Sequence, residues 1–148
     1  MVNQKEEICT DIGKAMGTFL RITSYGRRQG EVSKAVRAYF RNVENLCSRF
    51  RSDSDVSCVS AAAGVKPVMV SSLCRDICRC SLREAAFTGG IFDPTVGALT
   101  SLWNIGGENE RIPSKEEIEK AKVLIYYKHI KIGEGSVFLK EKGMSLDM

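Results

Sequence analysis

The sequence lacks the features that mark membrane-spanning, repetitive or strongly charged proteins. It has no run of about 18 apolar residues, so we expect no membrane-spanning helix. It also has no internal repeat and no low-complexity tract. The net charge is only +4, with acidic and basic residues interspersed along most of the chain. This balance favours solubility over a nucleic-acid-binding surface, so we expect no nucleic acid partner.

A secretory signal and a zinc motif are also absent. The N-terminal stretch MVNQKEEICTDIGKAMG is interrupted by charges and has no apolar core, so we expect a cytoplasmic protein. No two of the cysteines form a CxxC pair; they stand at positions 9, 47, 58, 74, 78 and 80. Small buried thiols in a reducing compartment are the favoured interpretation, because a metal site would need a further ligand. The single histidine, His129, is expected to be an ordinary strand residue.

The composition is that of a globular protein. The chain has 148 residues, of which 43% are apolar and 27% are charged. Such a length allows one domain at most, with a core that buries roughly two thirds of the unfolded chain's surface.

The first half of the chain predicts a strand and two helices. Residues 18–25 carry aromatic and β-branched residues in loose alternation, which predicts a strand. Apolar residues recur at helical spacing over 31–50, so we expect an amphipathic helix with one face on a core. The polar stretch 48–57 predicts turns and caps, and 65–70 a short strand. A second helix is expected over 73–86, with Ser71 or Ser72 as its N-cap.

The last part of the chain predicts a helix and a hairpin. Ser114 and Glu117 have the spacing of a capping box for a helix over 115–122. Residues 128–132 and 136–141 are expected to form a hairpin. A final strand is expected over 145–148. Together the elements predict an α+β or layered α/β domain whose sheet has an unfinished edge.

The segment GGIFDPTVGALTSLW, residues 89–103, has two interpretations. The two glycines are expected to end the preceding helix. Asp93 is a favoured N-cap and Pro94 a favoured first residue for a helix that reaches Trp103. Alternatively, the glycines allow a ligand to approach the backbone closely, beside a helix N-terminus that favours phosphate. The residues alone leave both a cap and a pocket wall open.

Five landmarks in order, from about residue 16 to the end, resemble one protein family. They are MGTFLRITSYG, SRFRSDSDVS, GGIFDPTVGALTSLW, PSKEEIEKA and KGMSLDM. On these motifs the chain is similar to the N-terminal half of FAD:protein FMN transferases, the ApbE family. The resemblance implies a layered, T-fold-like α+β fold, with residues 1–148 forming the N-terminal portion of a single domain.

The resemblance also implies an activity and a binding site. The family binds FAD with Mg²⁺ and transfers FMN to a Ser or Thr hydroxyl of a target flavoprotein, releasing AMP. A flavin fits an apolar slot with a few polar groups. The positions that match the family's FAD-binding residues are Met16, Phe50, Ile91, Phe92, Asp93 and Asp147. On this reading Asp93 both caps the helix and holds the ligand.

The chain departs from the family pattern in three ways. Phe50 stands where the family has Tyr, and Ser60 where it often has Asn. Family members continue past this length with the residues that complete the Mg²⁺ site, so we assign no metal ligand here. We therefore expect weak flavin binding and little or no turnover from this chain alone. The family often works outside the cytoplasm, anchored to a membrane.

A second interpretation belongs to a different class of protein. The chain would be a non-catalytic remnant that binds a flavin or a partner protein. An exposed last strand is a ready pairing site, so self-association is expected in that case.

Overall fold

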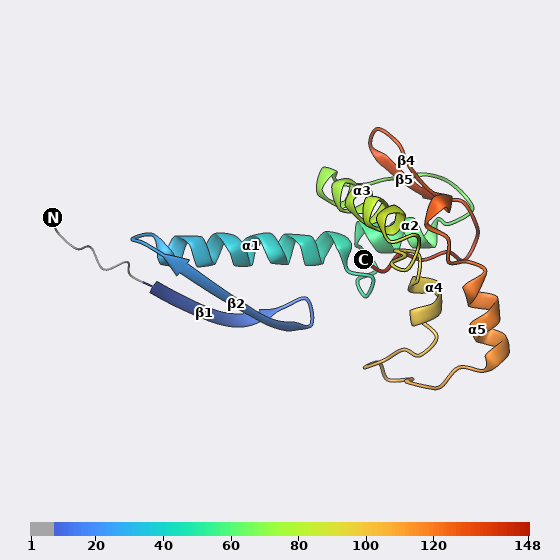
Figure 1. The fold of residues 1–148 in the computed structure, drawn as a ribbon, viewed down its shortest axis with the longest axis horizontal. Coiled ribbons are helices and arrows are strands. Elements are labelled where there is room, and N and C mark those ends of the chain that lie inside the picture. Colours follow the sequence, from blue (N-terminus) through green and yellow to red (C-terminus); the bar gives the residue numbers. More distant parts are fainter. Residues whose placement is uncertain (1–7) are drawn as a thin grey trace. The chain divides into compact units, whose positions relative to one another are not determined.

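The computed structural model describes residues 8–148, and the chain divides into two compact units (Figure 1). The first unit ends at Asn45 and the second runs from Leu46 to Met148. Residues 1–7, part of the stretch predicted to hold no signal sequence, lie outside the described residues. Over the described residues, no helix is long and apolar enough to cross a membrane.

A two-stranded hairpin opens the first unit. Strand β1 (Ile8–Ala15) pairs antiparallel with β2 (Thr18–Tyr25), with Ala15 opposite Thr18. Met16 (φ 51°) and Gly17 (φ 72°) form the two-residue connection, and two positive φ values give a turn whose twist suits a hairpin. The prediction of β2 is confirmed. β1 was not predicted, because its polar residues hide the alternation.

Helix α1 (Gln29–Cys47) follows. The prediction that one face of this helix packs on a core is wrong for the part in the first unit. Along the whole helix Ser33 is the one residue that is buried; Val32 and Tyr39 are exposed, and Phe40 is half-buried. A two-stranded hairpin offers too little apolar surface to cover such a face. The side chain of Arg37 instead makes a bidentate ion pair with Asp11, at 2.6 and 2.7 Å.

The second unit combines helices with a small antiparallel sheet of order β3-β5-β4. Its elements are α2 (Asp55–Ala61), β3 (Val68–Met69), α3 (Ser72–Phe87), α4 (Gly97–Thr100), α5 (Lys115–Lys122), the 3-10 helix η1 (Tyr127–His129), β4 (Ile130–Ile132) and β5 (Ser136–Leu139). The predicted hairpin is confirmed as β4 and β5. His129 was predicted as a strand residue, but it ends η1 instead.

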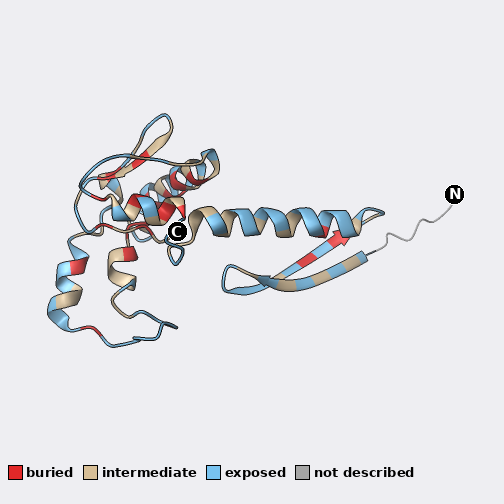
Figure 2. Ribbon diagram, turned by 180° about the vertical axis from the view of Figure 1, so that it is seen from behind, coloured by how far each residue is buried: buried red, intermediate tan, exposed pale blue. Residues whose placement is uncertain are grey.

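The core of the second unit lies between α2, α3, the sheet and the C-terminal segment (Figure 2). Val59 from α2, Cys74 from α3, Leu139 from β5 and Leu146 are almost fully buried.

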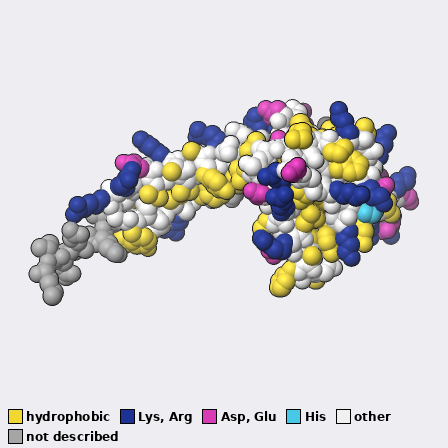
Figure 3. Space-filling view, turned by 90° about the horizontal axis from the view of Figure 1, so that it is seen from above, with side chains coloured by type: hydrophobic (Ala, Val, Ile, Leu, Met, Phe, Trp, Pro, Cys, Tyr) yellow, Lys and Arg dark blue, Asp and Glu magenta, His cyan; other side chains and the backbone are white. Residues whose placement is uncertain are grey.

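Lysine and arginine side chains are scattered over the face shown in Figure 3, so no large patch of one sign forms there.

Serine side chains cap the N-termini of three helices of this unit, α2, α3 and α5. Ser71 caps α3 and accepts a hydrogen bond from the Cys74 amide (3.2 Å), which confirms one of the two predicted caps. Ser54 caps α2 in the same way. Helix α2 was not predicted, because only seven residues separate its cap from its end and such a length shows little periodicity.

The final strand predicted over 145–148 is wrong. Ser145 forms one isolated parallel bridge with Val96, and no regular strand follows. Met144 and Leu146 are buried in the core, and the Leu146 amide donates to the Ser60 hydroxyl (3.1 Å). The segment is therefore held by packing and by single hydrogen bonds, among them this one to helix α2.

The cysteines are less uniformly buried than predicted. Cys74 and Cys78 belong to the core, whereas Cys58 and Cys80 are exposed. Cys47 hydrogen-bonds to Cys74, and this bond and burial raise the pKa of the Cys47 thiol. The bond to Cys47 lowers the pKa of Cys74, but its bond to Cys78 and its burial outweigh this and raise it to about 12. Both thiols are therefore protonated at neutral pH.

The predicted capping box at the start of α5 is confirmed, and its hydrogen bonds help to lower the pKa of Glu117. The Glu117 carboxylate accepts from the Ser114 amide and from the Arg111 guanidinium (2.7 and 2.8 Å). The Arg111 bonds, followed by the Ser114 amide, lower the pKa of Glu117 from 4.5 to about 2. Because the folded-state value is depressed, this contribution to stability is present above pH 4.5 and is lost as the pH falls through about 2.

We expect Arg111→Ala to raise the pKa of Glu117 toward 4.5, because it removes the largest cause of the shift. A pH titration followed by the NMR shift of the Glu117 carboxyl carbon would measure this. Lys115→Ala, in the same turn, is the control and should leave the titration unchanged. A Glu117 pKa that stays near 2 in Arg111→Ala would contradict this account.

Candidate functional site

The glycine turn at residues 89–90 presents apolar side chains to solvent. Gly89 and Gly90 have positive φ, and the Gly90 amide donates to Ala85 O (2.8 Å), a glycine-dependent end to helix α3. This confirms the predicted role of the two glycines. The next residues, Ile91 and Phe92, are 93% and 39% exposed. Exposed apolar side chains gathered at a turn are typical of a binding surface.

The Asp93 carboxylate holds this turn through three hydrogen bonds. Its Oδ1 accepts from the Thr95 amide (2.8 Å) and the Thr95 hydroxyl (2.6 Å). Its Oδ2 accepts from the Tyr127 amide (2.8 Å). Thr95 is fully buried, and its hydroxyl oxygen also accepts from the Tyr126 amide (2.9 Å). The carboxylate thus ties the glycine turn to the residues before β4.

The prediction that Asp93 caps a helix reaching Trp103 is wrong. Helix α4 spans only Gly97–Thr100, and its N-cap is Val96, which makes no side-chain capping bond. The Asp93 carboxylate is engaged two residues ahead and across the fold, so it is not available to cap the amides of α4. The other interpretation of this segment, a pocket wall, stays a prediction.

Asp147 lies beside the same turn. Its amide donates to Pro94 O (2.9 Å), and its carboxylate accepts from the Thr100 hydroxyl (2.8 Å). The backbone at Gly97 packs closely against the backbone at Ser145. A Cβ added to Gly97 would lie only 2.7 Å from Ser145 O. Asp93 and Asp147, 54 positions apart in the sequence, are therefore held on adjoining segments.

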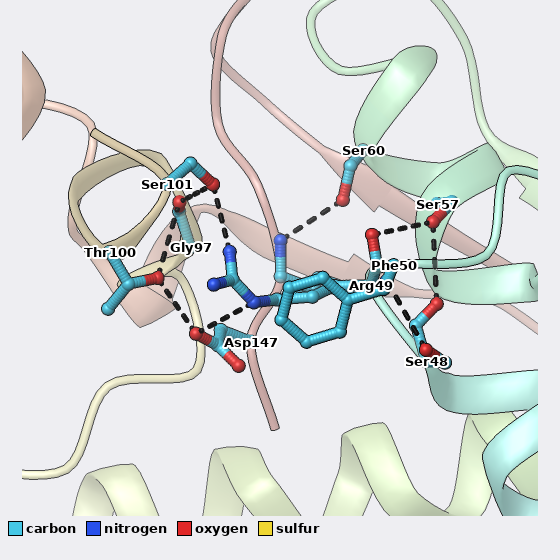
Figure 4. Close-up of polar contacts among 10 residues, drawn as sticks. Ser48, Arg49, Phe50, Ser57, Ser60, Gly97, Thr100, Ser101 and Asp147 are labelled. Atoms are coloured by element: carbon cyan, nitrogen blue, oxygen red, sulfur yellow. Dashed lines mark hydrogen bonds and ion pairs between the residues drawn. The ribbon is translucent and has the colours of Figure 1, made fainter. Parts of the chain in front are cut away.

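Phe50 reaches this cluster through its neighbour Arg49 (Figure 4). The Phe50 ring is 78% exposed, and the Arg49 guanidinium lies over it, 4.5 Å from the ring centroid. Arg49 also pairs with Asp147 (Nε to Oδ2, 3.4 Å) and donates to the Ser101 hydroxyl (2.9 Å). An exposed aromatic ring, an arginine and a carboxylate are thereby brought together.

The loop that carries Arg49 and Phe50 is anchored to the start of α2. The buried Ser54 hydroxyl donates to Ser48 O (2.6 Å), and the Ser57 hydroxyl contacts Arg49 O (3.3 Å). The polar residues predicted to form turns and caps here therefore position the loop.

Met16 belongs to the first unit, at the tip of its hairpin, so its place in a flavin site stays a prediction.

Sequence reasoning missed Arg49, Thr95, Thr100 and Ser101. The Asp-x-Thr spacing of Asp93 and Thr95 was a usable signal for a side-chain turn. Nothing in the sequence distinguishes Arg49 from its neighbour Arg51.

The acidic residues of the cluster do not gather around one point. Over residues 8–148, no group of three or more His, Cys, Asp or Glu side chains could hold a metal ion. The arrangement instead offers apolar surface, hydroxyls and one arginine, a set that suits a flat organic ligand with polar substituents.

Comparison with known proteins relates this arrangement to one family. The model of the ApbE family matches residues 16–148. The FAD:protein FMN transferase of Escherichia coli K12 is 33% identical over 125 residues, which cover 81% of this chain and 36% of that protein. The FAD:protein FMN transferase of Treponema pallidum is 29% identical over 144 residues, covering 90% of this chain and 40% of that protein.

Solved structures give the same relationship. The ApbE protein of Thermotoga maritima superposes with a TM-score of 0.86 at 27% identity, covering 95% of this chain and 47% of that one. The apo flavinyl transferase ApbE of Pseudomonas stutzeri gives 0.84 at 25%, covering 99% and 48%. The likeness confirms the predicted α+β fold. The chain spans less than half the length of these proteins.

Proposed function

Because the chain belongs to the ApbE family, we propose that it takes part in protein flavinylation, the transfer of FMN from FAD to a target flavoprotein. The observation that carries the proposal is the cluster in which Arg49 joins the exposed Phe50 ring to Asp147 beside the glycine turn. Phe50, Ile91, Phe92, Asp93 and Asp147 are the residues of the second unit that we assign to the flavin.

In the proposed reaction the acceptor is a Ser or Thr hydroxyl. Its oxygen bonds to the phosphorus of the FMN half of FAD, the bond from that phosphorus to the bridging oxygen breaks, and AMP leaves with the electron pair. The hydroxyl proton is lost as the new bond forms. Catalysis of such a transfer consists mostly of positioning and of stabilising charge.

The residues of this chain would bind and orient the flavin. The Phe50 ring and the apolar Ile91 and Phe92 would contact its planar ring system, and the Asp147 carboxylate would accept from its polar edge. Asp93 would hold the turn that carries two of these contacts. Its two oxygens already accept three hydrogen bonds, so its main contribution is to the shape of the site.

The Mg²⁺ ion implied by the family resemblance does not fit the described residues by themselves, since they contain no group of metal-ligating side chains. When bound, such an ion would stabilise the charge on the phosphates.

Titration of this chain with FAD, followed by flavin fluorescence anisotropy, tests the proposal. We expect saturable binding, and covalent flavin on an acceptor peptide, detected by mass, at a low rate at most. Binding without transfer would restrict the function to flavin binding, which is the alternative interpretation. No saturable binding would reject the assignment for this chain.

Phe50→Ala is expected to weaken FAD binding roughly tenfold, because the ring loses its stacking contact. Phe87→Ala is the matched control: Phe87 is also an exposed phenylalanine, 87% exposed, but lies on α3 outside the assigned residues. Equal FAD affinities of the two variants would remove Phe50 from the site. Phe50→Tyr, which restores the family's residue, is expected to bind more tightly than the natural chain.

A further inference from the structure

Arg49 occupies a central place among the residues assigned to the flavin. Its side chain is only 20% exposed, and it contacts the neighbouring Phe50 ring and two segments distant in the sequence. The guanidinium lies over the Phe50 ring, donates to Ser101 after α4, and pairs with Asp147 near the C-terminal end (Figure 4).

This arrangement differs from an ordinary surface ion pair. Exposed pairs contribute little, because water screens them and both side chains lose freedom. Here the Asp147 side chain is 31% exposed, and its carboxylate is also held by the Thr100 hydroxyl at 2.8 Å. The Arg49 backbone is fixed in turn, since Arg49 O is contacted by the Ser57 hydroxyl. Both ends of the pair are therefore held before any ligand arrives.

The planar guanidinium suits this double task. One face can stack on an aromatic ring while the N–H groups at its edge donate to oxygen acceptors, which a lysine ammonium cannot do in the same geometry. Its charge also offsets that of Asp147.

We propose that Arg49 is a positioning residue of the flavin site, one that holds the Phe50 ring and the Asp147 carboxylate in the mutual orientation needed to meet the same ligand. The inference rests on the proposed function. Arg49 acts through its two partners, and the part of the ligand it serves is the flavin ring system, not the phosphates.

The test compares variants of the full chain by their affinities for FAD and for riboflavin, which shares the ring system but has no phosphate. We expect Arg49→Ala to weaken both ligands by a similar factor, roughly tenfold, as for coupled residues in contact. Arg49→Lys should recover part of the affinity, since it keeps the charge beside Asp147 and loses the stacking plane.

Arg51→Ala is the matched control. Arg51 lies two positions away and pairs with the exposed Asp53 (3.0 Å), apart from the assigned residues, so its removal should leave both affinities within about twofold. Circular dichroism would establish that each variant is folded. If Arg49→Ala does not fold, the comparison of Arg49→Lys with Arg51→Lys carries the test.

A double-mutant cycle separates positioning from a general packing role. If Arg49 acts through Asp147, the losses in Arg49→Ala and Asp147→Asn will be smaller in combination than the sum of the two. Additive losses would overturn the proposal. So would a loss confined to FAD, which would place Arg49 on the phosphates, or unchanged affinities for both ligands. Failure of the natural chain to bind either ligand would instead reject the proposed function itself.

Discussion

Replacing Asp93 by alanine is expected to lower the free energy of unfolding of the second unit by roughly 3 kcal/mol, because hydrogen bonds to a charged acceptor are among the stronger ones and three are lost together. The amides of Thr95 and Tyr127 would lose their acceptor. Urea unfolding followed by the fluorescence of Trp103, the single tryptophan, would measure the change. Since the glycine turn would loosen as well, FAD binding should weaken in the same variant.

Two further variants define the size of this effect. Asp93→Asn keeps one acceptor oxygen but presents an N–H₂ group toward an amide donor, so an intermediate loss is expected. Asp53→Ala removes an exposed carboxylate paired only with Arg51, and should change stability by less than about 0.5 kcal/mol. If Asp93→Ala loses less than about 1 kcal/mol, the three bonds do not hold the turn.

Gly97→Ala is expected to disturb the site through the backbone. The added Cβ would lie 2.7 Å from Ser145 O and 2.9 Å from Ser145 C, and a backbone segment cannot rotate away as a flexible side chain can. We expect a loss of about 2 kcal/mol, typical of overpacking, and weaker FAD binding because Asp147 lies two residues further on.

Gly30→Ala is the control for this substitution. Gly30 lies in α1, and a Cβ there would meet nothing within 4 Å, so alanine should be neutral or slightly stabilising. Urea unfolding and FAD titration apply to both variants. Unchanged FAD affinity in Gly97→Ala would show that the close packing of this segment against α4 does not position Asp147.

The elements that the sequence predicted well are those whose causes are local. Strand β2, the capping box of α5 and the glycine end of α3 each depend on residues within a few positions of one another. The family motifs were also readable, since they are short and occur in order. Most of the proposed site residues of the second unit came from them.

The predictions that failed depend on partners distant in the sequence. Strand β1 gains its hydrogen bonds only from β2, and the polar residues within it conceal the pattern. The last four residues look like a strand, but their backbone finds single partners in Pro94 and Ser60 instead of a sheet neighbour. A helix-capping role for Asp93 was a reasonable local expectation, until the Tyr127 amide, 34 positions away, competed for the same carboxylate.

The sequence by itself determined the family, the α+β class and the short motifs, because these are set by residue order and local preference. Only the tertiary structure decided what those motifs do together. In the folded chain Asp93 holds a turn, and Arg49, not Arg51, is the arginine that contacts both Phe50 and Asp147. The physical reason is that a side chain's role follows from the partners that folding brings within hydrogen-bonding distance, and these partners lie up to about a hundred positions away in the chain.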